Sequence, residues 1–217
     1  MLGGAGIRIS SIQAGRIAPL GPRGVLSGFV KDRVDGPISA GLLGLSGDEQ
    51  ADLTVHGGPE KAVYGYGLAS YAAWRRAFPD HAGLLKPGGL GENLTIDGQE
   101  ETSVCIGDIV RVGGAVLQVT QPRQPCFKLA LRFADNGMPR AMIRNGLCGW
   151  YYRVLEPGVL TSGTAIVLEE RPNPEWSVAR FFRLITTHRV SEGELAELVA
   201  MNGLASQWRA SALNGAL

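Results

Sequence analysis

The sequence lacks the short motifs that mark several large enzyme classes. It has no Walker phosphate-binding loop, no Cys-x-x-Cys pair, no serine nucleophile elbow and no paired-histidine zinc motif. The glycine patterns near the N-terminus do not follow a strand and open a helix, which argues against a Rossmann dinucleotide site. The three histidines, His56, His81 and His188, have no ligand-like spacing to one another.

Cysteine and net charge are also scarce. The chain of 217 residues has three cysteines, which cannot form a closed set of disulfides, and a formal net charge of +1. This cysteine count favours a reducing compartment, and the near-neutral charge argues against a nucleic-acid or anionic-membrane partner. No secretion signal is visible, and no apolar run reaches the length of a membrane-spanning helix. We expect a soluble, cytoplasmic protein that binds neither nucleic acid nor membrane.

Short apolar runs separated by glycine-rich turns fill most of the chain. Residues 6–14 predict a first strand, and residues 104–119 form two valine-rich runs split by Gly-Gly, which is typical of a hairpin. The stretch "CGWYYRVLEPGVLTSGTAIVLEER" predicts two or three more strands, whereas residues 68–78 have helical spacing. Many short strands with turn signals favour a barrel over a doubly wound sheet. The expected fold is therefore mainly β.

The composition changes at "RPNPEWSV", where two prolines and an asparagine indicate a boundary. Beyond it, apolar residues recur at spacings of three and four, and "SEGELAELVAM" opens with a capping serine and Glu194 three positions later. A third short helix is expected over "ASQWRASAL". We divide the chain into a β domain, residues 1–171, and a helical domain, residues 172–217. The tail is too small to hold a core alone, so we expect it to pack on the barrel or build a homodimer contact, with docking of the electron donor as a further alternative, and we expect no redox site in it.

The stretch "QPRQPCFKL" places one of the three cysteines in an unusual setting. Its prolines predict a stiff, extended loop over residues 121–129. Arg123 and Lys128 are near Cys126 and would lower its pKa, which suits a metal ligand or a nucleophile. A buried small hydrophobic residue is the alternative. Cys105 and Cys148, in apolar surroundings, are expected in the core.

Two glycine-rich segments offer further candidates. In "VHGGPEKAVYGY", the tight turn with His56, Gly57 and Lys61 could present N–H groups and a cation to an anion, although a structural turn is the favoured explanation for His56. In "GGLGENL", Glu92 and Asn93 could hydrogen-bond a polar heterocycle, or Glu92 could tie down the loop.

Taken in order, five segments resemble the MOSC domain (molybdenum cofactor sulfurase C-terminal domain), and within it the bacterial YiiM-like branch. They are "SGFVKDRVDGP", "LGLSGDEQADLTVHGGPEKAVYGY", "GGLGENLTIDG", "VCIGDIVRVGGAVLQVTQPRQPCFKLA" and "CGWYYRVLEPG". The resemblance covers nearly the whole chain, and the tail is similar to the small three-helix domain that follows MOSC in that branch.

The resemblance implies a closed β-barrel of the pyruvate-kinase type with flanking helices. It also implies a molybdenum cofactor, a pterin whose dithiolene chelates the metal, with Cys126 as the catalytic residue and the protein ligand of molybdenum. The residues then expected around the cofactor are Arg123, Asn93, Glu92, Lys61, His56, Gly57 and Lys128. The pyridoxal phosphate associated with MOSC proteins belongs to a separate aminotransferase-like part, for which this chain has no length.

Members of this kind reduce N-hydroxylated compounds, including hydroxylaminopurines, amidoximes and hydroxylamines. We expect such a reductase, supplied with electrons by a partner flavoprotein or iron–sulfur protein. A sulfur carrier or cofactor-delivery module without its own turnover is the alternative. A third hypothesis, a barrel that has lost the cofactor, conflicts with the retained Cys126, Arg123 and Asn93. One departure from the family pattern is Leu147 in "GLCGW", where an arginine is usual, and it bears on the substrate more than on the fold.

Overall fold

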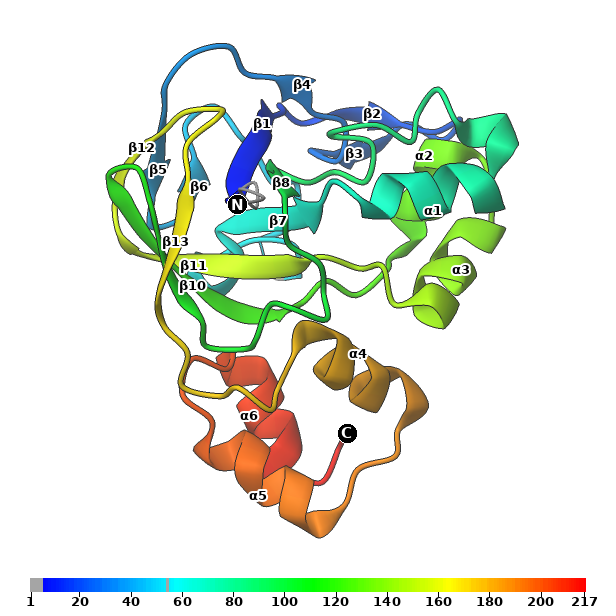
Figure 1. The fold of residues 1–217 in the computed structure, drawn as a ribbon. Helices are drawn as coiled ribbons and strands as arrows, with labels where there is room; N and C mark the ends of the chain where they lie inside the picture. The colour runs from blue at the N-terminus through cyan, green and yellow to red at the C-terminus, as the bar shows by residue number, and fades with distance from the viewer. Residues whose placement is uncertain (1–5, 54) are drawn as a thin grey trace, which may run out of the picture.

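An eight-stranded sheet is the largest element of the computed structural model, which describes residues 6–53 and 55–217 (Figure 1). Its strands are β1 (Arg8–Ala14), β4 (Asp32–Arg33), β7 (Val63–Gly67), β8 (Leu94–Asp97), β9 (Ile109–Val112), β10 (Ala115–Pro122), β11 (Trp150–Glu156) and β13 (Ile166–Glu170). They lie in the order β13-β9-β10-β11-β7-β8-β1-β4. The pair β7 and β8 is parallel, and the adjoining pairs β11–β7 and β1–β8 are antiparallel. The predicted first strand and the predicted hairpin, β9 with β10, are confirmed.

Two small sheets flank the large one. The first pairs β2 (Ala18–Leu20) with β3 (Val25–Ser27), and the second has the order β12 (Gly158–Leu160), β5 (Ile38–Gly41), β6 (Gly44–Leu45). With β11, β12 and β13, the stretch after Gly149 supplies three strands, where two or three were expected. The mainly β fold is therefore confirmed.

The closed barrel expected from the sequence is not confirmed. The described strands form an open order, with β13 at one end and β4 at the other. The two sides do approach each other, since an isolated bridge joins Arg8 to Ala165 and the Ile9 amide donates to the Thr164 carbonyl over 2.9 Å. A turn closes directly before β13, where the Thr164 amide donates to the Thr161 carbonyl over 3.2 Å. Two more backbone bonds join the same segments, from the Gly163 amide to the Ile9 carbonyl at 2.8 Å and from the Ile166 amide to the Ile7 carbonyl at 2.9 Å, so the contact is confined to the start of β1 and the start of β13.

Three helices and two short 3₁₀ turns accompany the sheet. They are η1 (Pro59–Lys61), α1 (Ser70–Ala77), η2 (Pro79–His81), α2 (Phe127–Phe133) and α3 (Gly137–Asn145). Helix α1 confirms the helix predicted over residues 68–78, and it buries Tyr71 and Trp74 in the core. In Figure 1, α1, α2 and α3 lie together at one side of the sheet.

The tail forms the three expected helices, α4 (Val178–Thr187), α5 (Glu192–Ala200) and α6 (Ser206–Leu213). Ser191 and Glu194 make the predicted capping box at the start of α5. Figure 1 shows the three helices grouped at the end of the molecule away from α1. Backbone bonds tie the tail to the segment before β9, because the Val178 amide donates to the Val104 carbonyl over 2.8 Å. The division into domains 1–171 and 172–217 stays a prediction.

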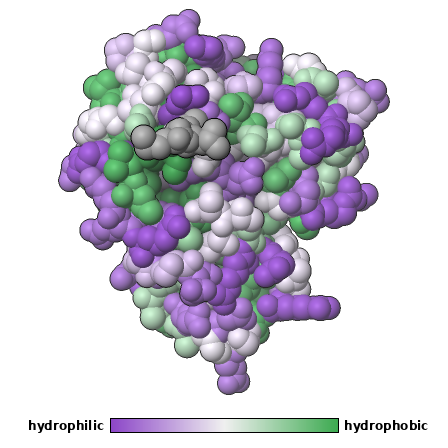
Figure 2. Space-filling model, in the orientation of Figure 1, coloured by the Kyte–Doolittle hydropathy of each residue, from purple (hydrophilic) through white to green (hydrophobic). Residues whose placement is uncertain are grey.

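Strand β10 is the element that places the site, since it is buried along its whole length and leads directly into Arg123 and Cys126. Polar side chains cover much of the face shown in Figure 2, and apolar side chains emerge there in separate patches. In the described parts of the chain, no helix has both the length and the apolar character that crossing a membrane requires.

Candidate functional site

A cavity of about 210 Å³ opens beside the C-terminal end of β10. Four parts of the chain form its wall: residues 27–29 and 31; residues 48–51, 55, 56 and 61; residues 90, 91 and 93; and residues 121–126 and 128. Tyr64, Tyr151 and Gln207 complete it. Six of the eight site residues expected from the sequence line this cavity, namely Cys126, Arg123, Lys128, Asn93, Lys61 and His56. The structure thus brings together residues that are far apart in the sequence.

The loop that carries Cys126 is shorter than expected. Strand β10 ends at Pro122, and Cys126 has extended backbone angles (φ −127°, ψ 170°) as the residue that precedes α2. The sequence predicted a loop as far as Leu129, and this is wrong from Phe127 onward. Pro125 disfavours helix in the residue before it and places no such restriction on the residues after it. The "FKLALRF" stretch is therefore free to form a helix that buries Leu129 and Phe133.

The thiol of Cys126 is partly buried and faces the cavity. Burial raises the pKa of this thiol, but a hydrogen bond with His56 and the positive charge of Arg123 outweigh that effect. The resulting pKa of Cys126 is about 7. A large share of the side chain is thus thiolate near neutral pH, which is the form that binds metals and attacks electrophiles.

Arg123 is 5% exposed and lies among aromatic rings. Its guanidinium carbon is 5.3 Å from the ring centre of Phe29 and 5.2 Å from that of Tyr64, and Nη1 lies 3.8 Å from the Met142 sulfur. Burial opposes the charge, but nearby Tyr64 and Tyr151 raise the pKa of Arg123, so the group stays cationic. Among the residues that the structure describes, no carboxylate forms an ion pair with it.

Lys128 is a second buried cation on the same side of the cavity. It lies in the first turn of α2 and is 7% exposed. In the described residues, its ammonium group has no hydrogen bond and no ion pair. Burying a charge without a partner is costly, so Arg123 and Lys128 together favour an anionic ligand beside Cys126.

Across the cavity lies a buried ion pair that the sequence reasoning missed. Lys31 pairs with Asp48, and both side chains are almost fully buried. Burial lowers the pKa of Lys31, and the Asp48 charge opposes this shift. Asp48 also accepts a hydrogen bond from Asn93 Nδ2 at 2.9 Å, while Asn93 Oδ1 accepts the Tyr64 amide at 3.0 Å. Asn93 therefore holds the cavity wall together, and its proposed contact with a cofactor stays a prediction.

Glu92 and Gly57 do not line the cavity. Glu92 is fully buried and accepts hydrogen bonds from the Tyr71 hydroxyl at 2.6 Å and the Gly88 amide at 2.8 Å. The Glu92 carboxylate thus holds the glycine-rich loop in place, which is the structural alternative given for this residue. The sequence pattern could not separate the two explanations, because the contacts of Glu92 with Tyr71 depend on the fold.

Lys61 and His56 face the cavity from the turn before β7. The Lys61 ammonium donates to the Val55 carbonyl at 2.7 Å, which closes this turn. Burial lowers the pKa of Lys61, with the charge of Glu60 opposing the shift. Lys61 also lies 3.4 Å from Oε1 of Gln207 in α6. A tail residue therefore reaches the cavity, which the sequence reasoning did not expect.

The other two cysteines are buried away from the cavity, as predicted. Burial, with a further contribution from the charge of Glu101, raises the pKa of Cys148 well above that of a free thiol, so this side chain stays protonated. Leu147, the departure from the family pattern, is partly buried against the core and does not line the cavity.

The profile of the MOSC domain matches residues 52–167, which include most of the cavity wall and Cys126. The chain belongs to the MOSC domain family. Protein YiiM of Escherichia coli is 36% identical to this MOSC protein over 187 residues, which cover 86% of the chain and 83% of YiiM. A protein named "Reductase" from Gibberella moniliformis (strain M3125 / FGSC 7600) is 42% identical over 192 residues. The match covers 86% of this chain but only 33% of that reductase.

Solved structures of YiiM share the fold of this MOSC chain. YiiM from Geobacillus stearothermophilus superposes with a TM-score of 0.80 and 29% sequence identity, covering 97% of this chain and 100% of that protein. YiiM from Escherichia coli gives the same TM-score and identity over 96% of this chain and 92% of that one. The similarity therefore includes the helical tail as well as the matched MOSC region.

Proposed function

We propose that the cavity binds a molybdenum cofactor and that Cys126 supplies a protein ligand to the metal. The observation that carries this proposal is the setting of Cys126: a thiol with a pKa of about 7 in a cavity that two buried basic residues, Arg123 and Lys128, also line. Neither cation has a carboxylate partner in the described residues. The MOSC family assignment supports the proposal.

The residues around the cavity fit such a group. A thiolate is a soft ligand, which suits molybdenum held by dithiolene sulfur atoms. Within the described residues, no three His, Cys, Asp or Glu side chains gather closely enough to hold a bare metal ion. Cys126 would thus be the single protein ligand of a metal that a cofactor already chelates. The guanidinium of Arg123 is a planar donor that suits the phosphate or the polar edge of a pterin.

We further propose that the protein, with the molybdenum cofactor bound, reduces N-hydroxylated compounds. The reaction is R–NHOH + 2 e⁻ + 2 H⁺ → R–NH₂ + H₂O, and the bound cofactor supplies its two-electron redox centre. Arg123 and Lys128 hold the anionic part of the cofactor, and the Lys31–Asp48 pair with Asn93 keeps the opposite wall fixed. The electrons come from a partner flavoprotein or iron–sulfur protein. The relative named "Reductase" supports this reaction class.

A sulfur carrier is the second candidate, and one observation favours it. Cys126 is partly exposed to the cavity and ionises near neutral pH, so it could also hold a persulfide. Such a protein would deliver sulfur or cofactor without its own turnover.

Two assays on the same preparation separate these functions. A reductase converts a hydroxylamine or a hydroxylaminopurine to the amine under anaerobic conditions with reduced viologen as donor. A carrier shows no such turnover and releases thiocyanate from Cys126 when treated with cyanide. Turnover without cyanide-labile sulfur supports the reductase, and the opposite result supports the carrier.

A further inference from the structure

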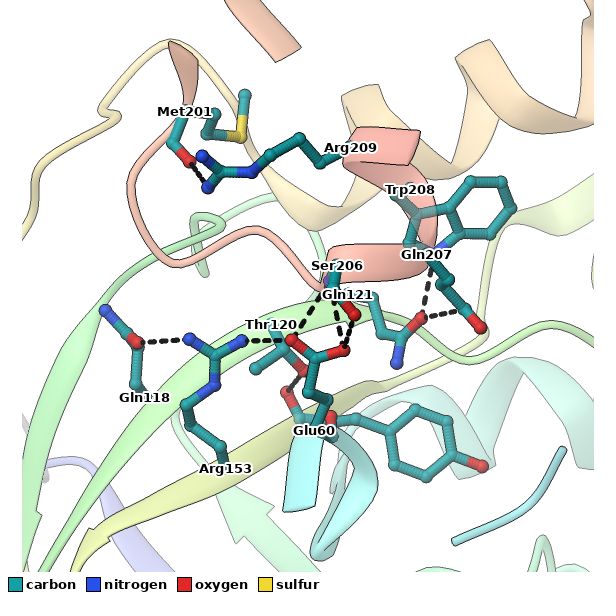
Figure 3. A network of polar contacts seen from close by, with 11 residues as sticks. Glu60, Gln118, Thr120, Gln121, Arg153, Met201, Ser206, Gln207, Trp208 and Arg209 are labelled. Atoms are coloured by element: carbon teal, nitrogen blue, oxygen red, sulfur yellow. Dashed lines mark hydrogen bonds and ion pairs between the residues drawn. The ribbon is translucent and has the colours of Figure 1, made fainter. Parts of the chain in front are cut away.

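Helix α6 begins against the turn that carries His56 and Lys61. The residue before it, Ala205, provides no side-chain cap, and the carboxylate of Glu60 fills that place. The Ser206 amide lies 2.9 Å from Oε1 and 3.0 Å from Oε2 of Glu60, and the Ser206 hydroxyl donates to Oε2 at 2.8 Å (Figure 3). A carboxylate at this position satisfies a free helix amide and complements the positive end of the helix dipole.

Glu60 is also fixed to the large sheet. Arg153 Nη2 in β11 donates to its carboxylate at 2.7 Å, and the Thr120 hydroxyl in β10 donates to its backbone carbonyl at 2.7 Å. Figure 3 shows Glu60 between Arg153 on one side and Ser206 on the other. Glu60 therefore connects the tail, the sheet and the turn in one network.

The neighbouring Lys61 extends this connection to the cavity. Its ammonium donates to the Val55 carbonyl and contacts Gln207 Oε1 in α6 at 3.4 Å. Val55 is next to His56, whose side chain hydrogen-bonds to Cys126. The position of the turn is thus coupled to α6 at two adjacent residues, Glu60 and Lys61.

Gln121 is held by the same helix from the other side. Its Oε1 accepts hydrogen bonds from Gln207 Nε2 at 2.6 Å and from Trp208 Nε1 at 2.8 Å. An indole N–H can only donate, so the Trp208 contact fixes which end of the Gln121 amide faces α6. Gln121 is 2% exposed and lines the cavity, and its Nε2 is buried without a hydrogen-bond partner in the described residues. Figure 3 shows Nε2 turned away from Trp208.

We propose that α6 shapes one side of the ligand site, which it reaches with Gln207. It positions the turn from Val55 to Lys61 through Glu60, and it orients Gln121 so that Nε2 remains as a donor for an acceptor oxygen of the ligand. The oxygen can belong to a pterin carbonyl of the cofactor or to the N–O group of a substrate. The inference rests on the proposed function for the identity of this ligand, whereas the positioning by α6 does not depend on it.

The positioning is tested on the cofactor-free chain by hydrogen–deuterium exchange. The double variant Ser206→Ala/Gln207→Leu removes the Ser206 hydroxyl contact with Glu60 and the side-chain amide contacts of Gln207 with Lys61 and Gln121, while the Ser206 backbone amide keeps its contact with Glu60. We expect faster exchange, by about tenfold, over residues 55–64, with α6 itself still protected. Ser211→Ala, in the same helix, is the matched control and should leave this exchange unchanged. Ser206→Thr, which keeps a hydroxyl at the start of α6, should also leave it unchanged. Unchanged exchange over residues 55–64 in a folded double variant would overturn the positioning role.

The donor role of Gln121 is tested by Gln121→Glu. A glutamate keeps an acceptor for Gln207 and Trp208 but replaces the free donor with an oxygen. If the acceptor oxygen belongs to the cofactor, the affinity for isolated molybdenum cofactor should fall at least about 10-fold. If it belongs to the substrate, the KM for a hydroxylamine should rise by a similar factor at unchanged cofactor content.

Trp208→Phe provides the second arm, because it keeps the ring that packs 5.6 Å from Phe181 and removes only the N–H donor. We expect a smaller loss, about 2- to 5-fold, since Gln207 still donates to Gln121. A folded Gln121→Glu variant with wild-type affinity and wild-type KM would overturn the donor role. A wild-type chain that binds no molybdenum cofactor would instead refute the proposed function, and the exchange experiment would still decide the role of α6.

Discussion

The side chains of His56 and Cys126 are hydrogen-bonded to each other inside the cavity, although a large part of the MOSC region separates them in the sequence. This contact and the charge of Arg123 outweigh the effect of burial and lower the pKa of Cys126 to about 7. A thiol with a lowered pKa is ionised above that pH and protonated below it. The reactivity of Cys126 should therefore rise between pH 6 and pH 8, below the range of an ordinary cysteine, whose pKa is about 8.5.

This expectation is checked by the pH dependence of alkylation with iodoacetamide, followed at the Cys126 peptide by mass spectrometry. His56→Ala should move the midpoint to higher pH, because the hydrogen bond that stabilises the thiolate is lost. His81→Ala is the matched control, since His81 contacts Asp135 at 3.1 Å outside the cavity. A midpoint that stays near 7 in His56→Ala would show that the contact with His56 has no influence on the thiol.

The three cysteines should differ in their effect on turnover. Cys126→Ser should keep the fold, because the side chain is only partly buried, and should reduce the reductase rate by at least about 100-fold through loss of the metal ligand. Cys105→Ser and Cys148→Ser should stay active when folded, since both thiols are buried away from the cavity. The rate with reduced viologen and a hydroxylamine is the measurement, with circular dichroism as the control for folding. Full activity of Cys126→Ser is incompatible with the proposed role.

Lys128 should show a conflict between function and stability. Lys128→Met keeps the apolar stem of a side chain that is 7% exposed and removes an ammonium group that has no ion pair in the described residues. The melting temperature of the cofactor-free protein should therefore stay the same or rise. Cofactor affinity should fall at least about 10-fold, because a charged contact is lost.

Thermal unfolding and cofactor titration measure the two quantities for Lys128→Met. Lys86→Met, at an exposed lysine, is the control and should change neither. A clear loss of stability with unchanged cofactor affinity would make Lys128 a structural residue.

Truncation after Arg171 tests the predicted domain boundary. The shortened chain loses α4, whose Phe181 and Phe182 are fully buried, and the backbone bond from Val178 to Val104. We expect a lower melting temperature and a larger tendency to aggregate, because the surface under α4 becomes exposed. Unchanged stability would show that the tail is an independent unit.

The mass of the full chain in solution is measured beside the truncated one. A full-length dimer that becomes a monomer on truncation supports the predicted homodimer contact of the tail. Equal assembly states of the two chains contradict it.

Local patterns predicted those parts of the fold that local residues control. The valine-rich hairpin of β9 and β10 and the capping box at Ser191 depend on neighbours in the sequence, and both are confirmed. The start of helix α2 was not predicted, because the prolines at positions 122 and 125 favour a loop and the sequence signal was extended to residue 129. The closed barrel came from the family resemblance, and the described strands do not form a full ladder at Arg8 and Ala165.

The residues of the candidate site also divide into those that neighbours in the sequence reveal and those that only the fold brings together. Cys126 and Arg123 could be selected from one loop, because thiol and cation are close in the sequence. The Lys31–Asp48 pair could not, since its members lie on two separate segments, directly before β4 and after β6, that meet only in the folded chain. Gln207 could not be found either, because the helical spacing of the tail predicted only packing on the barrel or a dimer contact. No local signal connects α6 to Glu60.

The central claim, that Cys126 binds molybdenum in this cavity, is tested most directly by X-ray absorption at the molybdenum edge. Wild-type protein and Cys126→Ser are loaded with the cofactor in parallel, and the number of sulfur ligands to the metal is compared. We expect one more sulfur ligand to molybdenum in the wild type than in the variant. The same sulfur count in both proteins, or a wild-type protein that retains no molybdenum, would contradict it.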